Sequence, residues 1–146
     1  CSVKIDDAVM AALEECIPLA PLHNPANITG IKACQDCMPG VPMVAVFDTA
    51  FHQTMPAKAY MYALPKAYYE NDKVRRYGFH GTSHKYVAKR VAALIGENVK
   101  MVNCHLGNGS SMAAILHSTS VSMSVTVKPP FWRCRLCTRP GFASLP

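Results

Sequence analysis

Residues 75–84 read RRYGFHGTSH, a polar stretch with two arginines, two histidines, two glycines and two aliphatic hydroxyls. The glycines allow a sharp turn or the close approach of a ligand, because they lack a Cβ. Apolar residues then recur at helical spacing as far as Ile95, with Thr82 or Ser83 available as the N-cap and Gly96 as the stop. The stretch therefore predicts a helix N-terminus, where free N–H groups and the helix dipole favour phosphate or carboxylate.

Two short apolar runs elsewhere in the chain predict strands. Val41–Phe47 is typical of a strand buried on both faces of a parallel sheet, and Asp48 follows it directly. A carboxylate there occupies the edge where α/β sheets place their chemistry, although a turn aspartate is the alternative. Lys100–Leu106 predicts a second buried strand. The loop Gly107–Ser111 after it favours a hairpin, with a phosphate cradle of backbone N–H groups as the functional alternative.

The first forty residues predict two helices. An amphipathic rhythm runs from Asp6 to Ile17 and ends at prolines. Asn24 can cap a second helix, with Pro25 at its first position. The expected buried stripe of that helix is Ile28, Ile31, Cys34 and Met38. His23 is then exposed at the helix entrance, where a plain surface histidine is one reading.

Between the two predicted strands, the segment after Phe51 is irregular. Prolines at positions 56 and 65 and tyrosines at 60, 62, 68 and 69 predict loops and short elements that carry aromatic packing.

Composition narrows the functional classes. The chain has 146 residues and a formal net charge of +6, and it contains no apolar run of the roughly 20 residues that span a membrane. All nine acidic residues lie before residue 120, so the excess positive charge is concentrated in the tail. A basic tail without a folded motif is weak support for nucleic-acid binding. A cytoplasmic protein is expected, and the start at Cys1 suggests that the true N-terminus is missing.

Seven cysteines include two C-x-x-C pairs, Cys34/Cys37 and Cys134/Cys137. A four-thiolate zinc site is one interpretation of such pairs. The first pair falls in a helical pattern about a hundred residues from the second, and an odd number of cysteines does not suit a disulfide framework. Reduced thiols that serve as small apolar side chains are the favoured interpretation.

Together, these segments resemble the acetate kinase family of carboxylate phosphotransferases. Order and spacing match the family from residue 1 to about 119. The matching strings are PLHNPANITG (21–30), VAVFDTAFHQTMP (44–56), RRYGFHGTSH (75–84) and NCHLGNGSSMAA (103–114).

The resemblance implies an α/β fold, as a fragment of the actin-like two-domain fold of the sugar kinase, Hsp70 and actin superfamily. It implies a homodimer that uses ATP and Mg²⁺ to phosphorylate acetate or another short carboxylate. Catalytic roles are implied for Asp48 in the metal region, for His80 on the transferring phosphoryl group, and for His23 as a contributor. Binding of the ATP phosphates is implied for His105, Leu106, Gly107, Asn108 and Gly109.

By the same resemblance, residues 1–49 form the end of the first domain and residues 50–120 the start of the second. Residues 121–146 are expected to be a non-family, disordered tail, with a reading-frame error as the leading explanation. Arg139 lies near the place of a family arginine, but its surroundings differ. A propionate or butyrate kinase of the same family and a non-catalytic nucleotide-binding remnant stay open as alternatives. The chain by itself is expected to be an inactive fragment.

Overall fold

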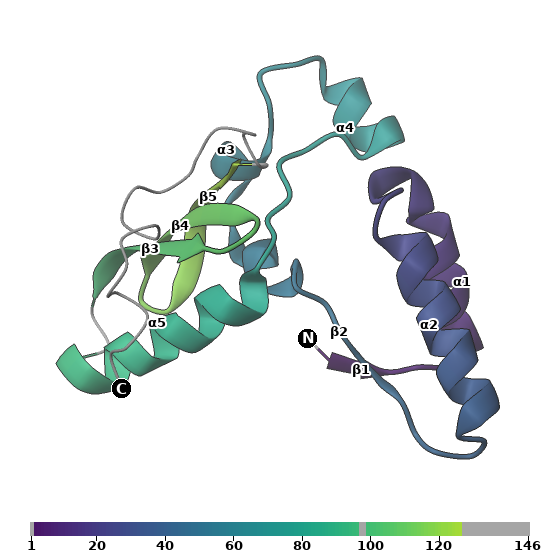
Figure 1. Ribbon diagram of the computed structural model, residues 1–146. Helices are drawn as coiled ribbons and strands as arrows, with labels where there is room; N and C mark the ends of the chain where they lie inside the picture. The colour runs from purple at the N-terminus through teal and green to yellow at the C-terminus, as the bar shows by residue number, and fades with distance from the viewer. Residues whose placement is uncertain (1, 97–98, 127–146) are drawn as a thin grey trace. The chain divides into compact units, whose positions relative to one another are not determined.

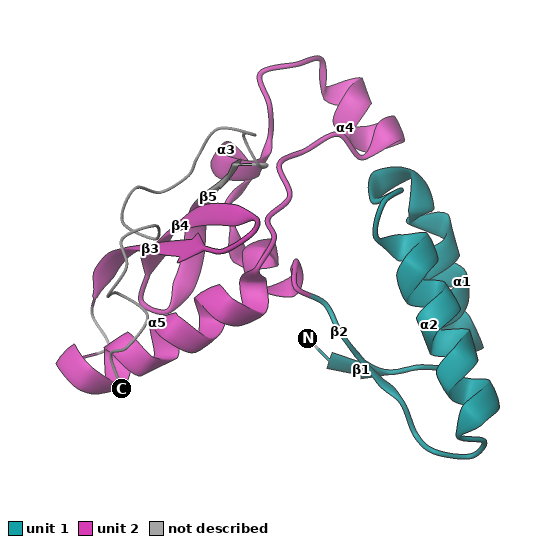
Figure 2. Cartoon of the chain, in the orientation of Figure 1, with its two compact units in different colours: residues 1–47 teal, residues 48–146 magenta. Residues whose placement is uncertain are grey.

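The computed structural model describes residues 2–96 and 99–126, and the chain divides into two compact units, residues 1–47 and 48–146 (Figure 2). Unit 1 comprises β1 (Ser2–Lys4), α1 (Asp7–Glu15), the 3₁₀ turn η1 (Ile17–Leu19), α2 (Asn24–Cys37) and β2 (Val44–Val46). Unit 2 comprises η2 (Ala50–Thr54), α3 (Ala57–Tyr60), α4 (Lys66–Asp72), α5 (Gly81–Ile95), β3 (Lys100–Leu106), β4 (Ser110–Leu116) and β5 (Thr119–Thr126) (Figure 1).

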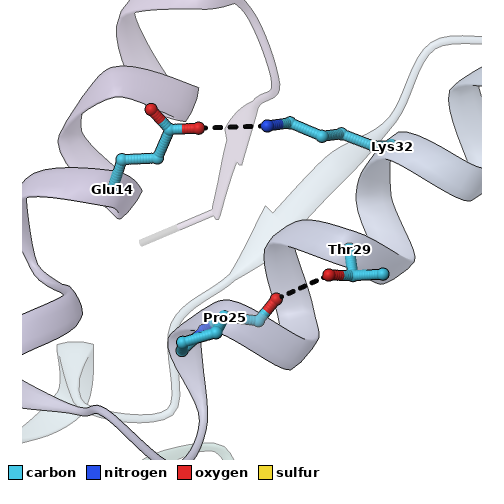
Figure 3. A network of polar contacts seen from close by, with 4 residues as sticks. All are labelled: Glu14, Pro25, Thr29 and Lys32. Atoms are coloured by element: carbon cyan, nitrogen blue, oxygen red, sulfur yellow. Dashed lines mark hydrogen bonds and ion pairs between the residues drawn. The ribbon is translucent and has the colours of Figure 1, made fainter.

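The two helices of unit 1 confirm the predicted pair. Asp6 caps α1, and its Oδ1 accepts a hydrogen bond from the Val9 N–H at 2.9 Å. Glu14 of α1 and Lys32 of α2 form an ion pair at 3.1 Å (Figure 3). Both side chains are more than half exposed, so this pair contributes little to stability.

The predicted cap of α2 is wrong. The helix includes Asn24 itself, and His23 is the N-cap residue. The Asn24 side chain donates instead to the Leu13 carbonyl at 3.2 Å, so a bond between helices replaces the local cap. Ile28 of the predicted stripe is buried, whereas Met38 is exposed at the C-terminal end of the helix.

The first predicted strand is shorter and more exposed than expected. β2 covers three residues and pairs antiparallel with β1, from Ser2 opposite Val46 to Lys4 opposite Val44. The side chains of Val44 and Val46 are largely exposed. The prediction of burial on both faces in a parallel sheet is therefore wrong for the described residues. Burial requires neighbouring strands or helices, which an apolar run cannot supply by itself.

Unit 2 is built on an antiparallel sheet in the order β3-β4-β5. Its inner face carries Met101, Asn103 and His105 of β3 opposite Ile115, Ala113 and Ser111 of β4. Its outer face carries Val102, Cys104 and Leu106 opposite Ala114, Met112 and Ser110. The hairpin around residues 107–109 is confirmed. Burial of β3 on both faces is not, because β3 is an edge strand of this sheet and its outer side chains are exposed.

Helix α5 covers the inner face (Figure 1). Ala88 packs with Ala113 and Ile115, and Phe51 and Met101 lie against them. The buried positions of α5 are Gly81, His84 and Ala88. The apolar stripe that helical spacing predicts includes Tyr86, Leu94 and Ile95, and these three residues are exposed. Small and polar residues face the sheet because the helix lies close to a face that itself carries histidine and serine.

Strand β5 continues past the residue where the resemblance was expected to end. Ile115 pairs with Ser120 but Ala114 pairs with Ser122, so β5 has one extra residue at Val121. Such a bulge changes which way the following side chains point. It leaves Ser120 buried opposite Ile115. Most of the predicted tail, including Arg139 and the pair Cys134/Cys137, lies outside the described residues.

The short elements between η2 and α5 confirm the predicted aromatic packing for Tyr60 and Tyr69, whereas Tyr62 and Tyr68 are exposed. The rings of Tyr60 and Tyr69 have centroids 5.8 Å apart, and the Arg75 guanidinium lies 3.9 Å from the centre of the Tyr60 ring. In the part of the chain that the structure describes, no helix has the length and apolar character to cross a membrane.

Candidate active site

His80 stands at the start of α5 in an unusual backbone conformation. It is the N-cap residue with φ of 57°, in the left-handed region that β-carbon-bearing residues rarely occupy. Its N–H donates to Asp48 Oδ2 at 3.2 Å, and the Gly81 N–H donates to the Asp48 carbonyl at 2.7 Å. A Cβ at position 81 would overlap that carbonyl oxygen, which explains the glycine. The prediction of Thr82 or Ser83 as N-cap is wrong, because Asp48 from a distant segment serves the helix end.

The imidazole of His80 is stacked on that of His105. Their ring centroids are 4.2 Å apart and the planes differ by 22°. His105 Nδ1 lies 2.9 Å from Ser83 Oγ, which holds the ring of β3 against the first turn of α5. The hydroxyl that was expected to cap the helix thus orients a histidine instead.

Behind this stack lies a buried serine shared by two histidines. Ser111 Oγ is 2.8 Å from His80 Nδ1 and 2.8 Å from His84 Nε2. Ser111 and His84 are fully buried. The alternation of β4 points Ser111 inward, and the position of His84 one turn into α5 points it at the same spot.

His52 fixes the backbone just before His80. Its Nε2 lies 3.1 Å from the Phe79 carbonyl and its Nδ1 2.9 Å from Ser120 Oγ. A carbonyl only accepts, so Nε2 carries the hydrogen and Nδ1 accepts from the serine. Thr54 Oγ1 also donates to the Ser120 carbonyl at 3.1 Å. The bulged strand β5 is thereby tied to η2 and to the segment that carries His80.

Burial keeps these imidazoles neutral. Burial, followed by the neighbouring His52, His105 and His80, lowers the pKa of His84 to about 4. Burial and then His105 also lower the pKa of His80, against a smaller opposing effect of the Asp48 carboxylate. Burial likewise lowers the pKa of His52. At neutral pH each of these three rings is therefore a one-hydrogen donor and one-lone-pair acceptor.

The loop Gly107–Gly109 lies beside His80. A Cβ on Gly109 would be 3.5 Å from Nε2 of that ring, an ordinary contact distance. The Gly107 N–H donates to the Gly109 carbonyl at 3.0 Å, so this amide is used within the loop. Asn108, between the two glycines, is exposed.

The structure brings Asp48, His80, His105 and Gly109 together. Two other predicted residues have no contact with this cluster within unit 2. His23 belongs to unit 1, where it is exposed at the N-cap of α2. Leu106 is on the outer face of the sheet and is 79% exposed, so it points away from the His105 side.

Sequence reasoning gave no site role to several residues of the cluster, namely His52, Ser83, His84, Ser111 and Ser120. A serine or histidine at a core-facing position was the available signal, because buried polar side chains require partners.

The donor set fits a magnesium ion only in part. Within residues 2–96 and 99–126 no group of three metal-binding side chains occurs, and the four cysteines there are free. Mg²⁺, however, is commonly held by one or two carboxylates together with substrate phosphates and water. The exposed carboxylate of Asp48 beside the histidine stack suits that mode of binding.

Comparison with known proteins identifies the family. The sequence profile of the acetokinase family matches residues 1–140, which extends past Ser120. An acetate kinase from Caldanaerobacter subterraneus subsp. tengcongensis is 63% identical over 131 residues, covering 88% of this chain and 33% of the relative. One from Desulfitobacterium hafniense is 62% identical over the same length. The chain spans about a third of the length of the curated relatives it matches.

Solved structures agree with this result. A propionate kinase from Francisella tularensis matches with a TM-score of 0.82 and 46% identity, over 85% of this chain and 33% of that one. Porphyromonas gingivalis acetate kinase matches with a TM-score of 0.78 and 50% identity, over 85% and 32%. The predicted fold class, an α/β fragment of the actin-like fold, is confirmed.

Proposed function

The chain belongs to the acetokinase family, and on that premise we propose that it supplies part of the active site of an acetate kinase. The reaction is the reversible transfer of a phosphoryl group from ATP to acetate, which gives acetyl phosphate and ADP. The observation that carries the proposal is the stacked pair of His80 and His105 between Asp48 and the Gly107–Gly109 loop.

The chemistry suits neutral imidazole donors. Phosphoryl transfer between two anions is catalysed mainly by positioning and by stabilising charge on the equatorial oxygens. His80, kept neutral, donates one N–H to such an oxygen without the solvation cost of a buried cation. Its ring is held in place by His105 on one face and by Ser111 at Nδ1. Acetate is itself a nucleophile, so the site needs no general base.

Asp48 is the side chain of this cluster that we assign to magnesium. The ion, when bound, would neutralise charge on the ATP phosphates. Asp48 also holds the N-terminus of α5 through the N–H groups of His80 and Gly81. One residue thus connects the metal region to the orientation of the histidine donor.

The proposal is tested in a chimera in which residues 2–126 replace the matching third of the Caldanaerobacter acetate kinase. We expect the chimera to form acetyl phosphate from ATP, Mg²⁺ and acetate. Asp48→Asn should reduce kcat by roughly a hundredfold or more, and His80→Asn should reduce kcat more than it raises KM. Asparagine is chosen at position 80 because it tolerates positive φ.

Matched controls are available in the chain. His117 is an exposed histidine with φ of 49° in the β4–β5 turn, so His117→Asn makes the same change away from the cluster. Asp36→Asn is the matching control for Asp48→Asn, because it removes a carboxylate at an exposed position of α2. Both should leave kcat unchanged. A folded chimera without turnover, or normal kcat in both site variants, rejects the proposal.

The match to a propionate kinase supports a second candidate substrate, propionate. Turnover of the chimera across acetate, propionate and butyrate separates these possibilities for the segments supplied by this chain. The 146 residues alone span about a third of the relatives. We expect them to show no acetate-dependent turnover.

A further inference from the structure

The hydroxyl of Ser111 can form hydrogen bonds with both His80 and His84 in only a limited number of ways. Its Oγ lies 2.8 Å from a nitrogen of each ring, and a hydroxyl carries a single hydrogen. It can therefore donate to one ring at a time. At least one of the two imidazoles must donate its own N–H to the serine oxygen.

His84 decides which ring donates. The ring is fully buried, and its Nδ1 finds no hydrogen-bond partner among the residues that the structure describes. A hydrogen on Nδ1 would be an orphaned buried donor, the kind of group that folded proteins rarely leave unpaired. A hydrogen on Nε2 points instead at Ser111 Oγ, 2.8 Å away. The favourable tautomer of His84 is the one protonated at Nε2.

The rest of the chain of hydrogen bonds follows. If Ser111 Oγ accepts from His84, the serine hydrogen finds its acceptor at His80 Nδ1. We propose that His84 and Ser111 are positioning residues that hold His80 in the tautomer with its hydrogen on Nε2. That N–H lies on the side of the ring next to Gly109.

This inference rests on the proposed function, because it gives the phosphoryl-binding histidine its donor. With the opposite tautomer, His80 would present a lone pair on Nε2 toward the loop and would repel a phosphoryl oxygen. A buried histidine with no access to substrate thereby sets the polarity of an imidazole that does have access. The Asp48 carboxylate does not perform this task, since it contacts the His80 backbone N–H.

The test is a long-range ¹H–¹⁵N correlation spectrum of histidine-labelled protein at pH 7.5. It is recorded on the 146-residue chain and on the chimera, so that a folded sample is available whichever of the two folds. We expect the pattern of a protonated Nε2 and an unprotonated Nδ1 for both His80 and His84. A protonated Nδ1 on His80 in folded protein overturns the proposal.

Two variants separate positioning from simple structural support. Ser111→Ala removes the relay, so the two ¹⁵N shifts of His80 should move toward each other as the tautomers mix, and kcat of the chimera should fall roughly tenfold. His84→Gln retains an amide donor toward Ser111 and should keep the wild-type His80 pattern, whereas His84→Leu should not. Ser120→Ala serves as the control. It removes the hydroxyl that bonds to His52 and should leave the His80 pattern unchanged.

The outcomes distinguish the two proposals. A protonated Nε2 on His80 in a folded chimera without turnover supports the tautomer and rejects the kinase function. Turnover with a protonated Nδ1 does the reverse. Identical His80 patterns in His84→Gln, His84→Leu and Ser111→Ala reject the positioning role even if all three variants lose activity.

Discussion

The two faces of the β3-β4-β5 sheet differ in how they treat polar and apolar side chains. The inner face, covered by α5 and η2, buries Ser111 and holds His105 beside the apolar Ala113 and Ile115. The outer face exposes Val102 and Leu106, at 71% and 79% of their surface, together with Cys104 and Met112. Polar groups are buried where hydrogen-bond partners have been built for them. Inner-face side chains therefore support the candidate site, whereas these outer-face side chains do not contact it in the described part of the chain.

The largest expected effect on stability comes from the apolar centre of the inner face. Ile115 is 2% exposed, and Ile115→Ala should lower the free energy of unfolding by about 2–5 kcal/mol. Met112→Ala on the outer face of the same strand is the control and should cost much less. Urea unfolding followed by circular dichroism measures both. Equal losses would mean that the outer face is also packed in solution.

Gly81 comes next, at the point where α5 meets Asp48. Gly81→Ala should cost about 1–3 kcal/mol, because the new Cβ overlaps the Asp48 carbonyl and backbone must shift. Gly30→Ala is a control of opposite sign. A Cβ there meets nothing within 4 Å inside α2, so it should stabilise by about 0.5–1 kcal/mol. Thermal unfolding measures both variants. Stabilisation by both would contradict the close approach of residue 81 to the Asp48 carbonyl.

Acidification should weaken the inner face without any substitution. The folded-state pKa of His84 is about 4, below its ordinary value of 6.5, so the unfolded chain binds more protons between these values. The contribution of neutral His84 to the free energy of unfolding is fully present above pH 6.5 and is lost as the pH falls toward 4. Buried His52 and half-buried His80 act in the same direction. Unfolding free energies measured from pH 7.5 to 4 should fall, and the slope should be shallower in His84→Gln.

The smallest effect is expected on the outer face. Leu106→Ser should change the free energy of unfolding by no more than about 0.5 kcal/mol, because the side chain is already 79% exposed. The same substitution would be far more costly on the inner face. A loss above 1 kcal/mol in a urea titration would show that Leu106 is buried in solution, for instance by association of chains.

The sequence predicted where most elements lie because their signals are local. The first helix, the helix after residue 80, the β3 strand and the 107–109 turn all depend on neighbours within a few residues. Burial was predicted less well. Apolar runs at residues 41–47 and 100–106 indicated strands, but exposure depends on which elements lie over them, and that information is not local.

Site residues were predicted where they lie in the sequence strings that match the family. The strings around Asp48, His80 and His105 suggested the residues that the structure brings together. Their supports were missed because each comes from a different segment. Ser111 acquires its role only when β4 lies against α5, and Ser120 and His52 acquire theirs only when β5 lies against η2. Asn24 and Ser83 show the same limit. Each was predicted to cap its own helix, and each instead bonds to a residue in another element.

The bond between His52 and Ser120 joins residues 68 positions apart, and those that hold His80 to Asp48 and to Ser111 close loops of 32 and 31 residues. Contacts so distant in sequence must bear their loop-closure entropy before they stabilise anything, and folds rich in them form slowly. On the ribosome, a nascent chain that stops before Ser120 can form α5 but cannot fasten His52. We therefore expect the contact of His52 with Ser120 to form after the helix that carries His80 and His84.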